Sequence, residues 1–87
     1  MTKYLRREGV VSVQLDGEAV LMDTSSGQYF RLNSTGSFIW SAMHSVMSPD
    51  EISGLIVEQF QIDGVTAQRD AEAMLDELRE QGLVVEQ

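Results

Sequence analysis

Cysteine is absent from this 87-residue chain, and histidine occurs once, at His44. Disulfides, thiolate metal sites and cysteine nucleophiles are therefore excluded, and so is a metal site built from several histidines. The apolar runs fall far short of the ~20 residues that cross a bilayer, and the N-terminus lacks the apolar core of a signal peptide. We therefore expect a cytoplasmic protein that holds no metal or other cofactor and has no membrane partner.

Basic residues are also scarce. Six lysines and arginines stand against 14 acidic residues, and three of the six (Lys3, Arg6 and Arg7) precede position 8. From Glu8 onward three arginines face all 14 acids, so this part has a net charge of −11. Such a field repels phosphate backbones and anionic headgroups and attracts cationic partners. The acids serve either as a solubilising surface or as the rim of a site for a basic ligand, and no nucleic-acid partner is expected.

The chain is too short to build an enclosed catalytic centre easily. At 87 residues it has room for one domain, which buries roughly 60–65% of the unfolded surface. The sequence contains no phosphate-binding loop, and paired carboxylates occur only on the last predicted helix, where solvent should surround most of them. We therefore expect a single domain, residues 1–87, that is not an enzyme and that begins with a flexible segment over residues 1–9.

Strand periodicity fills the first third of the chain. Residues 10–15 alternate apolar and polar side chains. An Asp-Gly pair, a strong hairpin signal, separates them from a returning strand over residues 18–23. A turn cluster at residues 24–27 then leads into a third strand over residues 28–32. The pattern predicts a three-stranded antiparallel meander.

Helical periodicity begins after this meander. Asn33 or Ser34 is predicted to cap a first helix, and a Ser-Pro-Asp-Glu capping box at residues 48–51 opens a second. Thr66 is predicted to cap a third helix, which Gly82 ends in a left-handed conformation, before an apolar tail folds back. Three strands followed by three helices predict an α+β fold in which the helices are segregated from a small sheet.

The third predicted strand is the candidate interaction edge. Residues 28–32 contain no proline and only one charged residue to guard the edge. An extended peptide can add to such an edge as a further strand; alternatively a helix covers it, or the open edges of two copies pair. Phe30 and Leu32 are predicted to face the core, with Tyr29 on the opposite face. Met74 is either core or the adaptable apolar wall of a groove.

Three short motifs occur in an order and spacing typical of one known family. They are Leu32-Asn33-Ser34-Thr35-Gly36-x-x-Ile39-Trp40, Ser48-Pro49-Asp50-Glu51-Ile52 and Leu78-x-x-x-Gly82-Leu83. The first looks like the strand-to-helix junction of the PqqD-like family of small peptide-binding domains, and the others like its second helix start and final helix end. The resemblance extends from Val10 to Val84. Within the family the chain is most similar to the standalone leader-binding proteins of lasso-peptide biosynthesis.

The resemblance implies a winged-helix-like fold that recognises the leader of a ribosomally made precursor peptide. The leader would add to the third strand and pack against the third helix, without catalysis. In the lasso group the leader typically offers a tyrosine, a proline and a leucine, often beside lysines, which suits an apolar groove with an acidic rim. The implied peptide-binding residues are Gln28, Tyr29, Phe30, Arg31, Leu32, Ala67, Asp70, Ala71, Met74, Leu75, Glu77 and Leu78.

The resemblance also implies partners and leaves alternatives. The domain, as a monomer or weak dimer, would deliver its precursor to a separate leader peptidase and a separate ATP-dependent cyclase. The alternative within the family is a PqqD-like peptide chaperone of a quinone-cofactor pathway or of another peptide-modifying pathway. A winged-helix DNA-binding module is the main rival. It needs basic residues on its recognition helix, whereas residues 34–81 hold only Arg69 and Arg79.

Overall fold

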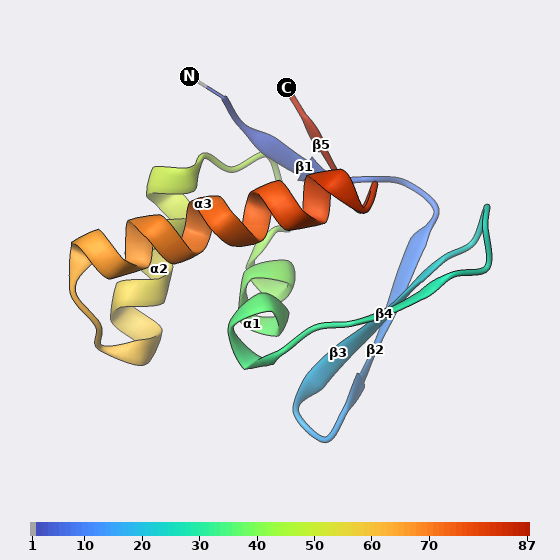
Figure 1. Cartoon of the computed structure of the whole chain (residues 1–87), viewed down its shortest axis with the longest axis horizontal. Coiled ribbons are helices and arrows are strands. Elements are labelled where there is room, and N and C mark those ends of the chain that lie inside the picture. The colour runs from blue at the N-terminus through green and yellow to red at the C-terminus, as the bar shows by residue number, and fades with distance from the viewer. Residues whose placement is uncertain (1) are drawn as a thin grey trace.

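The computed structural model describes residues 2–87 and contains three helices and two small sheets (Figure 1). The elements in chain order are β1 (Tyr4–Arg6), β2 (Val10–Leu15), β3 (Glu18–Asp23), β4 (Tyr29–Arg31), α1 (Ser34–Ala42), α2 (Pro49–Phe60), α3 (Gly64–Glu80) and β5 (Val84–Glu86). The predicted α+β class, with three helices and a three-stranded antiparallel sheet, is confirmed. The predicted order of elements is corrected, because one strand precedes the meander and another follows the helices.

Strands β2, β3 and β4 form the predicted meander. They lie in the order β2-β3-β4, and Leu21 of β3 is opposite Phe30 of β4. The hairpin between β2 and β3 turns at Asp16 and Gly17, whose φ angles of 53° and 80° are left-handed, as a tight two-residue hairpin requires. Figure 1 shows this sheet projecting to one side of the helices.

The helix starts follow their capping residues. Asn33 caps α1, because its side chain accepts the Gly36 N–H at 2.8 Å, and Ser48 forms the predicted capping box of α2. The predicted cap of α3 is corrected. Asp63 is the N-cap and accepts the Thr66 N–H at 2.8 Å, so that α3 begins at Gly64. Asp caps helices at least as readily as Thr.

The two ends of the chain form a second sheet that periodicity alone did not predict. β1 pairs antiparallel with β5, and Tyr4 also exchanges backbone hydrogen bonds of 2.8 and 2.9 Å with Met47. Figure 1 shows β1 and β5 beside each other. The expectation of a flexible segment over residues 1–9 is therefore corrected for residues 4–6, which form β1. The apolar tail that was expected to fold back forms strand β5. Strands of three residues have no local periodicity, and their pairing comes from tertiary context.

One apolar core lies beneath α3. The inner stripe of this helix (Ala67, Ala71, Leu75 and Leu78) is buried, and α3 packs along α2. Phe30 packs against this core and Leu32 is part of it, so their predicted inward orientation is confirmed. The other buried apolar residues are Tyr4, Ala19, Leu21, Ile39, Trp40, Met43, Ile52, Ile56, Leu83 and Val84. No helix within residues 2–87 is long and apolar enough to cross a membrane.

Candidate binding groove

Among residues 2–87, β4 pairs only with β3, so one edge of the three-stranded sheet is free along β4. The Gln28 carbonyl and the Leu32 N–H each bond β3 at 2.9 Å. Because bonded and non-bonded pairs alternate along an antiparallel ladder, Phe30 also directs its backbone groups toward β3. The N–H and C=O groups of Tyr29 and Arg31 therefore point away from β3, toward the free edge.

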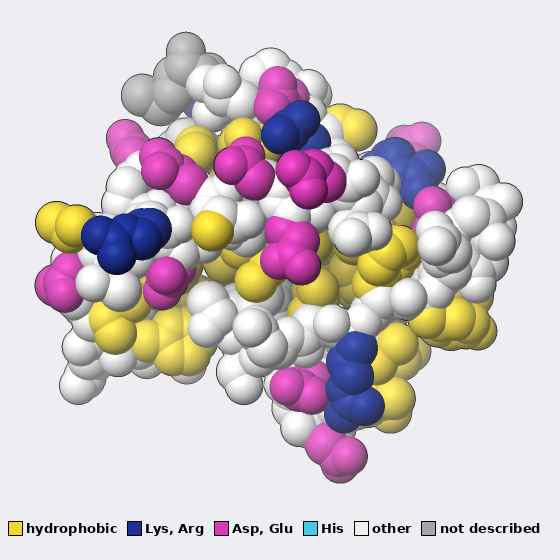
Figure 2. Space-filling view, viewed as in Figure 1, with side chains coloured by type: hydrophobic (Ala, Val, Ile, Leu, Met, Phe, Trp, Pro, Cys, Tyr) yellow, Lys and Arg dark blue, Asp and Glu magenta, His cyan; other side chains and the backbone are white. Residues whose placement is uncertain are grey.

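A cavity of about 430 Å³ lies between β4 and α3. We call it the large cavity. Figure 2 shows apolar side chains exposed between the row of acids along α3 and the sheet. The lining comes from β4, from its junction with α1, and from the second half of α3 with the loop that follows. It consists of Tyr29, Phe30, Arg31, Leu32, Asn33, Met74, Glu77, Leu78, Gln81 and Leu83.

A second cavity, of about 260 Å³, adjoins the first, and we call it the small cavity. Its lining residues are Asn33, Thr35, Asp70, Ala73, Met74 and Glu77. Three of these, namely Asn33, Met74 and Glu77, also line the large cavity. The two cavities together form one groove along α3, open to solvent and mixed in polarity.

Most of the residues that the sequence predicts for peptide binding meet in this groove. Seven line the large cavity: Tyr29, Phe30, Arg31, Leu32, Met74, Glu77 and Leu78. Asp70 lines the small cavity. Their contact with a peptide stays a prediction, but the structure brings all eight to one surface.

Four predicted residues lie elsewhere. Ala67, Ala71 and Leu75 are 0% exposed and belong to the core, so their side chains support the groove from beneath and do not line it. Gln28 belongs to the turn before β4. Its carbonyl accepts from Asp23 at 2.9 Å, and its N–H donates to the Ser26 hydroxyl at 3.2 Å, so its backbone groups are already engaged.

Sequence reasoning missed five lining residues: Asn33, Thr35, Ala73, Gln81 and Leu83. A signal existed for three of them. Asn33 and Thr35 belong to the junction motif between the third strand and the first helix, and Leu83 follows the helix-ending glycine. Ala73 and Gln81 had no such signal, because a small or polar residue on an exposed helix face is compatible with many surroundings.

Acidic side chains rim the groove. Asp70 and Glu77 are exposed and line the small cavity. Arg31 is the cation that lines the large cavity, and its Nε atom lies 3.1 Å from Oε1 of Glu18 in β3. Because Glu18 already neutralises Arg31, the α3 side of the rim keeps its negative charge. Cationic groups of a ligand are therefore favoured there. Within residues 2–87, no group of three or more histidine, aspartate or glutamate side chains could hold a metal ion.

Other acids lie on the opposite flank of α3. Glu72 and Asp76 line a separate cavity of about 460 Å³ beside Tyr4. They lie one helical turn apart and so form a row offset from Asp70 and Glu77. Burial, followed by the charges of Glu86 and Asp76, raises the pKa of the Tyr4 hydroxyl. This flank carries negative charge without facing the groove.

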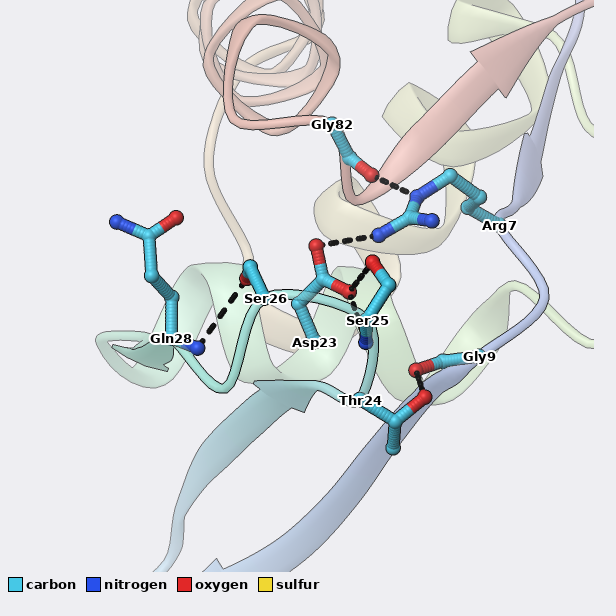
Figure 3. A network of polar contacts seen from close by, with 8 residues as sticks. All are labelled: Arg7, Gly9, Asp23, Thr24, Ser25, Ser26, Gln28 and Gly82. Atoms are coloured by element: carbon cyan, nitrogen blue, oxygen red, sulfur yellow. Dashed lines mark hydrogen bonds and ion pairs between the residues drawn. The ribbon is translucent and has the colours of Figure 1, made fainter.

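A polar network ties the two walls of the groove together (Figure 3). The Arg7 guanidinium lies 2.6 Å from the Asp23 carboxylate at the end of β3, and Arg7 Nε donates to the Gly82 carbonyl just after α3. Asp23 also accepts the Ser25 hydroxyl at 2.7 Å and the Ser25 N–H at 3.0 Å. Hydrogen bonds from Ser25, together with Arg7, hold the pKa of Asp23 well below its usual value. Arg7 thus connects the turn that leads into β4 with the end of α3.

Comparison with known proteins gives one family and two similar structures. Residues 18–84 match the family model of coenzyme PQQ synthesis protein D (PqqD). The structure of TbiB1 in complex with the TbiA(beta) leader peptide is 33% identical, with a TM-score of 0.82, over 92% of this chain and 93% of that one. A lasso peptide synthetase B1 complexed with the leader peptide is 27% identical, with a TM-score of 0.79, over 94% of this chain and 96% of that one. No curated protein sequence matches the chain.

Proposed function

Because the chain belongs to the PqqD family, we propose that it binds the leader of a ribosomally made precursor peptide and does no chemistry on it. The leader adds as a further strand along the free edge of β4, and α3 forms the opposite wall. Main-chain hydrogen bonds supply affinity in this mode, and the pockets beside the strand supply specificity.

The observation that carries this proposal is the free edge of β4 beside a cavity that is lined in part by apolar side chains. Tyr29 and Arg31 direct their backbone N–H and C=O groups away from β3, where an extended peptide can meet them. Side chains on one face of that peptide would enter the groove, in contact with Met74 and Leu78. Asp70 and Glu77 at the rim suit a leader that carries lysines.

Within the family we propose a role of the lasso-peptide type. One similar structure is a lasso peptide synthetase B1 with its leader, and the junction Leu32-Asn33-Ser34-Thr35-Gly36 resembles that group. The chain would then present its precursor to a separate leader peptidase and a separate ATP-dependent cyclase. A peptide chaperone of a quinone-cofactor pathway is the second candidate, favoured by the match to the PqqD model.

A winged-helix-like arrangement is compatible with three helices beside a small sheet, and we retain it as a finer description. Its use in DNA binding is disfavoured by charge. Arg69 and Arg79 are the only basic residues among residues 34–81, and Arg79 already lies 3.3 Å from Glu86 and 3.8 Å from Asp76. A DNA-binding helix needs free cations that neutralise phosphates.

The test is binding without turnover. A panel of synthetic lasso leader peptides, including the TbiA(beta) leader and the leader of any precursor encoded beside this chain, is titrated by calorimetry, with the intact mass of each peptide followed afterwards. We expect one-to-one binding of at least one peptide and no change in mass. Absence of binding across this leader panel contradicts the proposal, and a processed peptide contradicts the non-catalytic role. Duplex DNA at physiological salt is the negative control.

A further inference from the structure

The groove has two compartments with a shared boundary. Asn33, Met74 and Glu77 line both the large and the small cavity. Asn33 and Glu77 are exposed, whereas Met74 is half-buried and packs against the core. Met74 is therefore the apolar part of the boundary and reaches from the core into the groove.

Met74 rests on a glycine of the neighbouring helix. A Cβ atom built on Gly36, in the first turn of α1, would lie 3.1 Å from the Met74 methyl carbon, 3.2 Å from its sulfur and 3.3 Å from Asn33 Oδ1. The backbone at Gly36 is helical and not left-handed, so the chain conformation alone does not require glycine. Glycine is a poor helix former. The space above Gly36 is instead filled by the thioether of Met74.

The contact between Met74 and Gly36 matters because methionine has a flexible side chain. It is unbranched, has three rotatable bonds and fills whatever space its neighbours leave. With a methyl group at position 36, the thioether would have to move outward by a few tenths of an ångström, toward the groove. The position of the boundary between the two cavities is thus fixed by a contact between α1 and α3.

We propose that Met74, seated on Gly36, divides the groove into two side-chain subsites and sets the size of the leader side chains that each accepts. This inference rests on the proposed leader binding. In an added strand, side chains on the same face recur every second residue, about 6.6 Å apart. Two inward side chains of the leader can then lie on either side of Met74, the bulkier one in the large cavity.

The test measures size preference and not affinity alone. A peptide of the leader panel that binds the wild-type chain is first scanned with alanine to find the apolar positions that matter. Each of these positions is then varied among Ala, Leu and Trp. The ratio of dissociation constants for Leu and Trp at one position is its size preference. A variant that merely loosens the fold weakens all three peptides together and leaves this ratio unchanged.

Met74→Ala should join the two cavities and shift the size preference toward Trp by about tenfold at one position or both, as expected when a pocket gains several methylene volumes. Gly36→Ala should push the methionine outward and shift the preference toward smaller side chains. In the Met74→Ala background, Gly36→Ala should cause a much smaller shift, because the thioether it displaces is gone and Asn33 Oδ1, 3.3 Å from the new Cβ, remains.

Matched controls separate this contact from general effects. Gly54→Ala changes a helical glycine whose Cβ would meet nothing within 4 Å, and Met47→Ala shortens a half-buried methionine between α1 and α2, outside the groove. Neither should alter the size preference. Circular dichroism verifies the fold of each variant. If Gly36→Ala unfolds, the ratios of dissociation constants measured for Met74→Ala test the inference without it. Unchanged ratios in a wild-type chain that binds leaders overturn the inference but not the proposed function, whereas a wild-type chain that binds no leader overturns both.

Discussion

The Asp23 carboxylate lies 2.6 Å from the Arg7 guanidinium, and this pair links segments that are distant in the sequence. Asp23 ends β3 and begins the turn into β4, while Arg7 also donates to the Gly82 carbonyl after α3. Arg7 therefore links the turn that precedes β4, the strand with the free edge, to the loop that follows α3, the helix that faces it. This pair is only partly exposed, so solvent screens it less than a surface ion pair.

The pair predicts a specific dependence of stability on pH. Hydrogen bonds from Ser25 and the charge and hydrogen bond of Arg7 lower the pKa of Asp23 in the folded state. A lowered pKa contributes stability above the unfolded value of about 3.9 and loses it as the pH falls toward the folded value. We expect Asp23→Asn to melt at a lower temperature than the wild type at pH 7, with the difference narrowing below about pH 4.

Thermal unfolding followed by circular dichroism between pH 7 and pH 3 measures this. Asp16→Asn, at the exposed tip of the hairpin between β2 and β3, is the matched control and should follow the wild-type curve. If the difference in melting temperature between Asp23→Asn and the wild type were the same at every pH, the charged form of the Asp23 carboxylate would not be stabilised by its neighbours in the folded state.

The register of β4 predicts which backbone donor serves the leader. The Arg31 N–H points to the free edge, so Arg31→Pro should remove one hydrogen bond to the leader and leave the ladder with β3 intact. A hydrogen bond contributes about 0.5–1.5 kcal/mol net, so the dissociation constant should rise about twofold to tenfold. Phe30→Pro should instead destabilise the sheet, because the Phe30 N–H points toward β3.

Arg31→Ala is the control for the loss of the arginine side chain, and only the difference between the alanine and proline variants reports on the backbone donor. Calorimetry gives the affinities and circular dichroism gives the fold. If Phe30→Pro keeps its fold and Arg31→Pro binds as Arg31→Ala does, the leader does not add to this edge.

Charge at the groove predicts the salt dependence of leader binding. Asp70 and Glu77 should attract basic residues of the leader, at about 0.2–1 kcal/mol each. Affinity should therefore weaken modestly as salt rises, and the double variant Asp70→Asn/Glu77→Gln should show a shallower slope. Asp76→Asn, on the opposite flank of α3, is the control and should keep most of the wild-type slope. Equal slopes in all three proteins would mean that the rim acids only solubilise.

Much of the architecture follows from local sequence patterns. The hairpin at Asp16, the capping box at Ser48 and the glycine at the end of α3 each have a conformational requirement that few residues satisfy. Gly82 adopts a φ of 75°, as predicted. The motifs also sufficed for the family resemblance, which the match over residues 18–84 confirms.

The remaining features depend on contacts that no local pattern encodes. β1 and β5 pair across nearly the whole chain, and Arg7, just after β1, donates to the carbonyl of Gly82, just after α3. The alternation of β2 predicts a strand but not its surroundings. Val11 and Val13 are 51% and 58% exposed, because none of the described residues 2–87 forms a layer over that face of the sheet. The packing of Met74 on Gly36 likewise became visible only once α1 and α3 were side by side.

A charge at position 74 gives the most direct test of where the leader binds. Met74→Glu places a carboxylate on the boundary between the two cavities, where an apolar leader side chain is expected to dock. An imperfectly compensated polar group at such a contact costs about 1–3 kcal/mol, so calorimetry should show weaker binding by that amount. The fold should persist, because Met74 is half-buried and its side chain can turn toward solvent. Met47→Glu, at a half-buried methionine between α1 and α2 and outside the groove, is the control, and where it folds it should bind as the wild type does. A Met74→Glu protein that unfolds would assign Met74 to the core, and one that folds and binds unchanged would place the leader elsewhere on the chain.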